Sequence, residues 1–416
     1  MYATIFFMIT VDKAFRIVME KADVIERVEI VGFNSANGRV IAEDIFSDID
    51  IPPFNKSSMD GYAVISSDLK TVPVELEVIE EIPAGYFPTK RVINGTVSKI
   101  MTGAPVPEGA DTVVMVENTE LLKNGKVKIL SKVKKGENIS SKGEDVKKGD
   151  KILSRGTTLR CQEISMLSAT GHTSISVISR PRVSILATGS ELVEPDKGLM
   201  PGQIRNSNSY SLFAQCQNSD INPDYLGIAI DEEADLRGKI KKGINSDVFL
   251  ISGGVSMGDY DIVPSILREC GIKIEFERVA IKPGKPFLFG TKGKTLIFGL
   301  PGNPVSTLII FEIFIKPALK KMSANSANTN FAGKAKLEKV FERRKAGREE
   351  YIPVAITRSG GEARAMPVKF NGSADMMALT KANGLLIIPI GIDKLNAGDI
   401  CDVIWFSATD PSYMPA

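Results

Sequence analysis

Histidine and cysteine are scarce in this chain of 416 residues, and their scarcity excludes several kinds of chemistry. The one histidine, His172, rules out a multi-histidine metal site and lies in no motif of a serine–histidine triad. The four cysteines are far apart and form no C-x-x-C pair, which disfavours a disulfide framework and a zinc ribbon. We therefore expect the chemistry to rest on carboxylates, lysines, arginine and hydroxyl groups.

An excess of one charge and long apolar runs are missing as well. The 52 basic and 50 acidic residues are mixed along the chain and leave a formal net charge of +2, so the composition predicts no nucleic-acid partner. The apolar start at 1–11 is too short for a membrane-spanning helix and has no basic leader. We expect a cytoplasmic protein with no membrane partner, in which any anion site is local.

The hydrophobic pattern divides the chain into three parts. Residues 1–178 predict a composite, irregular β-rich region with helices, made of two subdomains. In residues 179–325 short apolar strands alternate with helical patterns, which favours a central α/β domain with a mostly parallel sheet. A polar linker at 323–330 leads to residues 326–416, which predict a small C-terminal β-barrel. The fold class is therefore multidomain, α/β plus β.

The central domain is expected to carry ligand-binding loops, because loops after the carboxyl ends of parallel strands bind ligands in such sheets. A helix is also expected after Thr10, whose hydroxyl can cap it. The predicted strands are 183–187, 247–251 and 295–298, and the other predicted helices are 161–169, 207–218, 232–243 and 304–322.

Two lysines, Lys282 and Lys285, form the clearest candidate binding feature. They place two ammonium groups three residues apart on a backbone stiffened by proline and opened by glycine, which favours a small oxyanion or a phosphate. The segment Pro-Gly-Asn-Pro follows at 301–304. There Asn303 is expected to cap a helix with Pro304 in its first turn, and the start of that helix can also face an anion.

The glycine-rich loop at 252–261 is the richest in polar groups. Its glycines expose backbone N–H groups suited to phosphate, and Asp259 and Asp261 can bind a hard cation such as Mg²⁺. It is not a Walker loop, because it has no G-K-[ST] ending. Four other polar loops carry Asp60, Thr102, Asp145 and Glu191. Taken alone, each of these loops is explained as a turn or as the entry to a helix.

Six motifs occur along the chain in a fixed order: P-P-F-x-x-S-x-M-D-G-Y-A at 52–63, M-T-G-A-P-x-P at 101–107, T-G-S-E-L at 188–192, S-G-G-V-S-x-G-D-Y-D at 252–261, K-P-G-K-P at 282–286 and P-G-N-P at 301–304. Together they resemble the molybdopterin molybdenumtransferase family, which includes the catalytic E domain of gephyrin. The resemblance spans nearly the whole chain. It departs from the family at Asn55, where many relatives have Asp.

The resemblance implies an enzyme that inserts molybdate into adenylylated molybdopterin and releases AMP, giving molybdenum cofactor in a Mg²⁺-dependent reaction. It requires no covalent nucleophile, because a molybdate oxygen or water can attack the phosphate once both are positioned. The resemblance also implies a homodimer, with an active site that joins the α/β and C-terminal domains of one subunit to the N-terminal region of the other. The adenylyltransferase and molybdoenzyme apoproteins are the protein partners that it suggests.

Residue by residue, the resemblance assigns three sets of side chains. The catalytic set is Asp60, Thr102, Glu191, Asp231 and Asp261, of which Glu191, Asp231 and Asp261 would bind Mg²⁺. The substrate-binding set is Asp145, Ser252, Gly253, Gly254, Asp259, Pro301, Gly302 and Asn303. The molybdate-binding set is Lys282, Lys285, Arg348 and Ser373.

Two other functions remain open from the sequence. The related molybdopterin adenylyltransferase shares the α/β fold, but it is normally a single domain, and the flanking regions that carry Asp60, Arg348 and Ser373 argue against it. A gephyrin-like scaffold is the alternative from a different class. The chain has neither a second α/β domain nor a long disordered linker, which argues against that function too.

Overall fold

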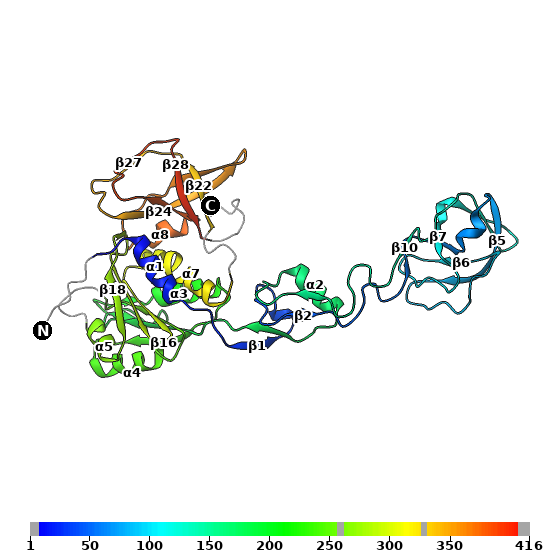
Figure 1. The fold of residues 1–416 in the computed structure, drawn as a ribbon. Helices are drawn as coiled ribbons and strands as arrows, with labels where there is room; N and C mark the ends of the chain where they lie inside the picture. The colour runs from blue at the N-terminus through cyan, green and yellow to red at the C-terminus, as the bar shows by residue number, and fades with distance from the viewer. Residues whose placement is uncertain (1–7, 256–261, 326–330, 407–416) are drawn as a thin grey trace. The chain divides into compact units, whose positions relative to one another are not determined.

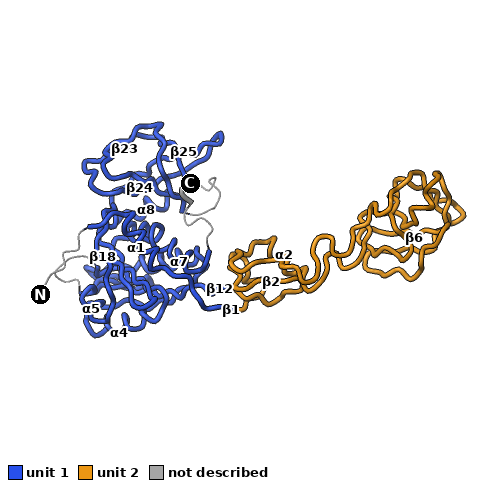
Figure 2. The backbone as a smooth tube through the Cα atoms, in the orientation of Figure 1, with its two compact units in different colours: residues 1–29, 178–416 blue, residues 30–177 orange. Residues whose placement is uncertain are grey.

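The chain folds into two compact units. The computed structural model describes residues 8–255, 262–325 and 331–406. Unit 1 comprises residues 1–29 and 178–416, and unit 2 comprises residues 30–177 (Figure 2). Because unit 1 contains both ends of the chain, the polypeptide leaves it after the first helix and returns to it before the central sheet.

A six-stranded sheet forms the centre of unit 1, in the order β16-β13-β17-β21-β20-β18. The first four strands run parallel, and β20 and β18 are antiparallel to their neighbours. The predicted mostly parallel sheet is confirmed, whereas β16, β18 and β20 were not predicted. The strands are β13 (Val183–Thr188), β16 (Asp224–Ala229), β17 (Val248–Ser252), β18 (Lys273–Arg278), β20 (Pro286–Lys292) and β21 (Thr295–Leu300).

Helices cover both faces of this sheet (Figure 1). None of the helices in the described ranges combines the length and the apolar character that a bilayer-spanning segment requires. The helices of unit 1 are α1 (Val11–Lys21), α3 (Asn208–Gln217), α4 (Glu233–Gly243), α5 (Val263–Glu269), α6 (Pro304–Ile310), the π-helical turn η4 (Phe311–Ile315), α7 (Lys316–Met322) and α8 (Met376–Thr380).

Alternating side chains of the parallel strands enter two separate cores. In β17, Val248 and Leu250 pack with α1, α3 and α6, whereas Phe249 and Ile251 pack with α4 and α5. All four side chains are fully buried, as expected for a strand covered on both faces. This packing explains why β17 is a continuous apolar run in the sequence rather than an alternating one.

The first helix, α1, packs on the core of the central sheet. Thr10 precedes it and accepts a hydrogen bond from the Lys13 backbone N–H at 3.2 Å, as predicted for its cap. Ala14 and Val18, one turn apart, are buried in the same core as β17. The domain boundaries drawn at 178 and 325 remain predictions, and residues 326–330 of the predicted linker lie outside the described residues.

The C-terminal part of unit 1 is a closed five-stranded β-barrel, as predicted. Strand β24 pairs with both β25 and β26, so the order β24-β25-β22-β28-β26 closes on itself. A short strand of the central domain, β19, extends the barrel in parallel with β24. The strands are β19 (Ile281–Lys282), β22 (Phe331–Leu337), β24 (Glu349–Ser359), β25 (Glu362–Pro367), β26 (Gly384–Ile388) and β28 (Ile400–Trp405), with the pair β23 (Phe341–Glu342) and β27 (Lys394–Leu395) beside them.

Unit 2 is β-rich and has separate hydrophobic cores. One core gathers around α2 (Cys161–Ala169), which begins and ends where it was predicted, and another fills a sheet of order β7-β4-β6-β5-β9-β8. The strands are β2 (Ile45–Phe46), β3 (Lys56–Ser57), β4 (Gly61–Val64), β5 (Val74–Ile82), β6 (Thr96–Ile100), β7 (Thr112–Met115), β8 (Thr119–Leu121), β9 (Lys126–Ile129), β10 (Ile139–Ser140) and β11 (Lys151–Leu153). The pair β1 (Val28–Val31) and β12 (Ile175–Ile178) spans the two points at which the chain passes between the units.

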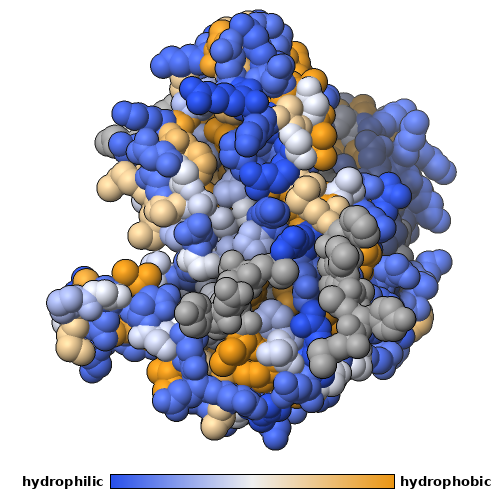
Figure 3. Space-filling view, turned by 90° about the vertical axis from the view of Figure 1, so that its left-hand side faces the viewer, coloured by the Kyte–Doolittle hydropathy of each residue, from blue (hydrophilic) through white to orange (hydrophobic). Residues whose placement is uncertain are grey.

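The mixed composition of the chain is visible on its surface. On the face shown in Figure 3, hydrophilic residues are interspersed with smaller hydrophobic groups. Single exposed hydrophobic residues of this kind are normal in folded proteins, so they identify no site by themselves.

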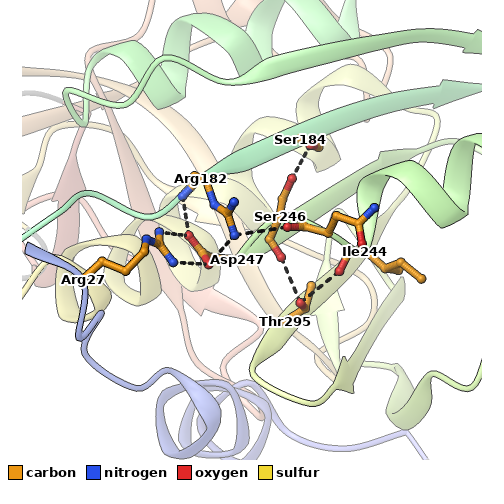
Figure 4. A network of polar contacts seen from close by, with 8 residues as sticks. Arg27, Arg182, Ser184, Ile244, Ser246, Asp247 and Thr295 are labelled. Atoms are coloured by element: carbon orange, nitrogen blue, oxygen red, sulfur yellow. Dashed lines mark hydrogen bonds and ion pairs between the residues drawn. The ribbon is translucent and has the colours of Figure 1, made fainter.

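Asp247 organises a polar network at the place where the chain leaves and re-enters unit 1 (Figure 4). Its carboxylate accepts hydrogen bonds from both terminal nitrogens of Arg27, at 2.9 and 2.5 Å, and from the backbone N–H of Arg182 at 2.7 Å. Burial alone would raise the pKa of Asp247, but the hydrogen bonds from Arg27 and Arg182 outweigh it and lower the pKa. The carboxylate therefore ties the outgoing segment to the returning one.

We expect Asp247→Asn to lower the free energy of unfolding at pH 7 by about 1.5–3 kcal/mol, because charge-assisted hydrogen bonds are lost. Since the folded-state pKa is depressed, this stabilisation is present above the unfolded-state pKa of about 3.9 and is lost as the pH falls through the folded-state pKa. Urea unfolding of both proteins at pH 7 and at pH 3 measures this difference in the free energy of unfolding. Asp402→Asn, in an exposed pair with Lys334, is the control. An Asp247→Asn effect that is equally large at both pH values contradicts this account.

Candidate functional site

Four loops that carry predicted site residues emerge side by side at one edge of the central sheet. The register pairs Ala187 with Ser252 and Ser252 with Leu300, and it pairs Thr188 with Ala229. The loops that follow β16, β13, β17 and β21 therefore start level with one another. They contain Asp231, Glu191, Ser252–Gly254 and Pro301–Asn303, respectively.

The loops that carry Glu191 and Asp231 are bound together through Ser190. The Ser190 backbone N–H donates to Asp231 Oδ2 at 2.9 Å, and the Asp231 N–H donates to Ser190 Oγ at 3.1 Å. Both carboxylates are exposed. A β-carbon on Gly189, whose φ is +145°, would lie 2.6 Å from Glu191 Oε2, so the Glu191 side chain folds back over Gly189.

These two carboxylates fit the predicted magnesium site in kind. Proteins commonly hold Mg²⁺ through one or two carboxylates, with water and substrate phosphate as the remaining ligands. Asp261, the third predicted ligand, and Asp259 lie outside the described residues. Among the described side chains, no three His, Cys, Asp or Glu residues form a metal-binding group.

The glycine loop after β17 lies directly against β13. A β-carbon on Gly253, whose φ is +93°, would lie 2.3 Å from the carbonyl oxygen of Thr188, and one on Gly254 would lie 2.6 Å from Thr188 Oγ1. The Gly253 N–H donates to the Leu300 carbonyl at 3.0 Å. Only glycine permits this close approach, which fixes the backbone at Gly253 and Gly254. Because the Gly253 N–H is bound to Leu300, it is not available to a phosphate, contrary to the prediction for this glycine.

Asn208, the first residue of α3, was not predicted, yet it connects two predicted loops. Its Nδ2 donates to Ser252 Oγ at 2.9 Å and to the carbonyl of Gly302 at 2.8 Å, and the residue is 9% exposed. An asparagine at the start of a helix is an ordinary capping residue in a sequence. Only the fold brings Ser252 and Gly302 within its reach.

Asn303 differs from its prediction in one respect. It occupies the N-cap position of α6 with Pro304 in the first turn, as expected, but its side chain makes no capping hydrogen bond. Instead Asn303 Nδ2 donates to Ser373 Oγ at 2.8 Å, and the Val305 N–H donates to the Ser373 carbonyl at 3.1 Å. The side-chain amide of Asn303 therefore binds a residue of the C-terminal domain. The fold thus brings two predicted residues, Asn303 and Ser373, together.

The segment that carries Lys282 contacts a cation of the C-terminal domain, Arg348. Lys282 ends β19, and NH1 of Arg348 donates to the carbonyl of the neighbouring Ile281 at 3.3 Å. Lys285 is exposed, and its carbonyl accepts from the N–H of Val279 at 3.1 Å. Lys282 and Arg348 are therefore brought together, although Arg348 lies far along the chain.

In unit 2, Asp60 and Thr102 form one contact. Asp60 Oδ1 accepts hydrogen bonds from the backbone N–H of Thr102 at 2.7 Å and from Thr102 Oγ1 at 2.8 Å. The backbone hydrogen bond, followed by the hydroxyl, lowers the pKa of Asp60. A β-carbon on the next residue, Gly61, would lie 1.9 Å from the carbonyl oxygen of Val114, which explains the glycine of the Asp-Gly pair.

The loop that carries Asp145 is bound to the segment that precedes Asp60. The Asp145 N–H donates to the Ile51 carbonyl at 3.0 Å, and the Lys142 N–H donates to Asn55 Oδ1 at 2.8 Å. An aspartate at position 55 offers the same acceptor, which is why the departure from the family pattern costs no contact here. Asp60, Thr102 and Asp145 thus lie on connected loops of unit 2.

Comparisons with known proteins give the family. Three family models match consecutive parts of the chain: MoeA N-terminal region (domain I and II) at 9–171, Probable molybdopterin binding domain at 184–321, and MoeA C-terminal region (domain IV) at 335–406. A molybdopterin molybdenumtransferase of Bacillus subtilis (strain 168) is 34% identical over 395 residues, which cover 93% of this chain and 92% of the relative.

Two further relatives agree. A Nostoc protein, also named molybdopterin molybdenumtransferase, is 36% identical over 397 residues, which cover 91% of this chain and 88% of the relative. The crystal structure of a molybdopterin biosynthesis moea protein from Pyrococcus horikosii is 30% identical, with a TM-score of 0.82, and the match covers 97% of this chain and 100% of that one. The chain therefore belongs to the molybdopterin molybdenumtransferase family, and the resemblance drawn from the six motifs is confirmed.

We expect Gly253→Ala to lower the free energy of unfolding by about 2–4 kcal/mol, because the left-handed backbone and the clash with Thr188 both oppose a β-carbon. Gly361→Ala is the matched control, since Gly361 has a similar φ of +85° and open space around it. It should cost only about 1–2 kcal/mol. Urea unfolding of both variants compares them, and equal losses would show that the clash has no effect.

Proposed function

We propose that this protein inserts molybdenum, supplied as molybdate, into adenylylated molybdopterin, with Mg²⁺ required and AMP released. The observation that carries the proposal is the convergence of cations from two domains: Lys282 and Arg348 both meet the end of β19. A tetrahedral dianion needs this kind of concentrated positive charge. Ser373, held by Asn303, adds a hydroxyl at the same domain boundary.

The phosphate end of the substrate is assigned to the loops at the sheet edge. Ser252, Gly253 and Gly254 offer a close-packed backbone, and the 301–303 loop adjoins them through Asn208. Glu191 and Asp231 would hold Mg²⁺, which neutralises phosphate charge when it is bound. The protein's own residues would then hold the oxyanion in line with the phosphoanhydride, so that the two groups meet in the orientation that reacts.

A homodimer is part of the proposal, because the predicted residues are divided between the units. Asp60, Thr102 and Asp145 belong to unit 2, whereas the cations and the sheet-edge loops belong to unit 1. In a symmetric dimer each site can take its N-terminal residues from the partner subunit. We assign the reaction to the cytoplasm, with the adenylyltransferase as the supplier of substrate and molybdoenzyme apoproteins as acceptors of product.

The extent of the family match favours this reaction over the two alternatives. The relatives align over more than nine-tenths of this chain, including the flanking regions that a single-domain adenylyltransferase normally lacks. A scaffold function has no specific observation in its favour. ATP consumption with free molybdopterin would favour the adenylyltransferase instead.

We expect Lys282→Ala to fold and to reduce molybdate-dependent AMP release by about 10–100-fold, because a charged hydrogen-bond donor is lost at the oxyanion. Asp261→Ala should abolish the same reaction. AMP release from adenylylated molybdopterin with Mg²⁺, with and without molybdate, is the measurement. Lys334→Ala, which removes an exposed cation from the barrel, should retain the rate. Unchanged release by Lys282→Ala and Asp261→Ala would refute the assignment.

We expect impaired Asp60→Ala and Lys282→Ala subunits to complement each other when they are mixed and allowed to exchange. A mixed dimer has one intact site if the site takes Asp60 from one subunit and Lys282 from the other. Random pairing in equal amounts should then restore about a quarter of the wild-type rate of AMP release. No recovery, despite exchange shown by native mass spectrometry, would place both residues in the same subunit's site.

A further inference from the structure

Glu350 is a buried carboxylate to which the motifs assign no role. It is 4% exposed, and it is the register partner of Lys282 where β24 pairs with β19. Its Oε1 lies 2.7 Å from Lys282 Nζ, and its Oε2 lies 3.2 Å from NH1 of Arg343. Burying a carboxylate is unfavourable unless it is paired, and these two cations are its partners.

Arg343 connects the same carboxylate to the loop that carries Arg348. The Arg343 side chain is 4% exposed. It donates from NH1 to the carbonyl of Arg348 at 2.8 Å and from Nε and NH2 to two further carbonyls, those of Ile392 and Pro389. Arg348 in turn donates to the carbonyl of Ile281, next to Lys282. The contacts therefore form a closed ring that runs through Glu350 and includes two of the four predicted oxyanion ligands, Lys282 and Arg348.

We propose that Glu350 is a positioning residue for oxyanion binding, which holds Lys282 directly and Arg348 through Arg343; this inference rests on the proposed function. An ammonium group has three donors, and Glu350 takes one. The Lys282 side chain remains 47% exposed, so its other donors are available to an anion. Fixing this flexible side chain before the anion arrives reduces the entropy that binding has to overcome.

The charge of the ring makes the proposal testable. Arg343, Lys282 and Arg348 carry three positive charges and Glu350 one negative charge, which leaves a formal +2, opposite to the charge of a tetrahedral dianion. If Glu350 acted only through its own charge, removing it would tighten anion binding. If it acts by positioning, removing it weakens binding. The two explanations predict opposite signs.

The experiment measures the dissociation constant of molybdate by equilibrium dialysis with the full chain. We expect Glu350→Gln to raise it about tenfold, because the glutamine oxygen can serve one cation while its amide N–H groups face the other. The KM for molybdate should rise with the saturated kcat retained. Asp402→Asn, which removes a carboxylate from an exposed cross-strand pair in the same barrel, should leave both values unchanged.

A double variant separates positioning from general damage. If Glu350 acts by positioning these cations, Lys282→Ala combined with Glu350→Gln should bind molybdate less weakly than the sum of the two single losses predicts, because the loss through Lys282 is already present and only the loss through Arg348 is added. Additive losses, or unchanged or tighter binding by Glu350→Gln, would overturn the inference.

If Glu350→Gln fails to fold, Glu350→Asp keeps the charge at a shorter reach and should raise the dissociation constant several-fold. No rise in the dissociation constant would overturn the inference. Failure of the wild type to bind molybdate would instead overturn the proposed function, and this inference with it.

Discussion

The aligned ends of four parallel strands are the constraint on which the candidate site depends. Because β16, β13, β17 and β21 are held in register, the loops that leave them start at the same level. Their close packing then excludes side chains at Gly253 and Gly254. The polar groups of these loops are thus positioned by the hydrophobic cores on either side of the sheet, at a distance from any substrate.

The short strand β19 gives the proposed oxyanion site a different kind of support. It belongs to the central domain in sequence, yet it pairs with the barrel strand β24. This pairing joins Lys282 to Glu350 and brings Arg348 beside Ile281, while Asn303 holds Ser373 elsewhere on the same boundary. Cationic and hydroxyl groups from two domains are therefore fixed by backbone pairing instead of by long flexible side chains alone.

The sequence was informative where a signal is local. Strands β13, β17 and β21 are apolar runs that end at glycine or proline, and they were predicted to within two residues, whereas β16 contains Gly227 at a φ of +83° and an irregular register that obscure its pattern. The motifs also selected Asp60 and Lys282 as candidate site residues, and these assignments stay predictions. Glu350 and Asn208 could not be found in this way, because their roles depend on partners that only the tertiary fold brings near.

The double hydrogen bond of Asn208 has a thermodynamic consequence. Its amide nitrogen carries two hydrogens, so it can serve the loop after β17 and the loop after β21 at the same time. A ligand that orders one of these loops leaves less freedom for the other to lose. Ligand groups that contact the two loops would then be coupled through Asn208, and the coupling free energy would be the same whichever group binds first.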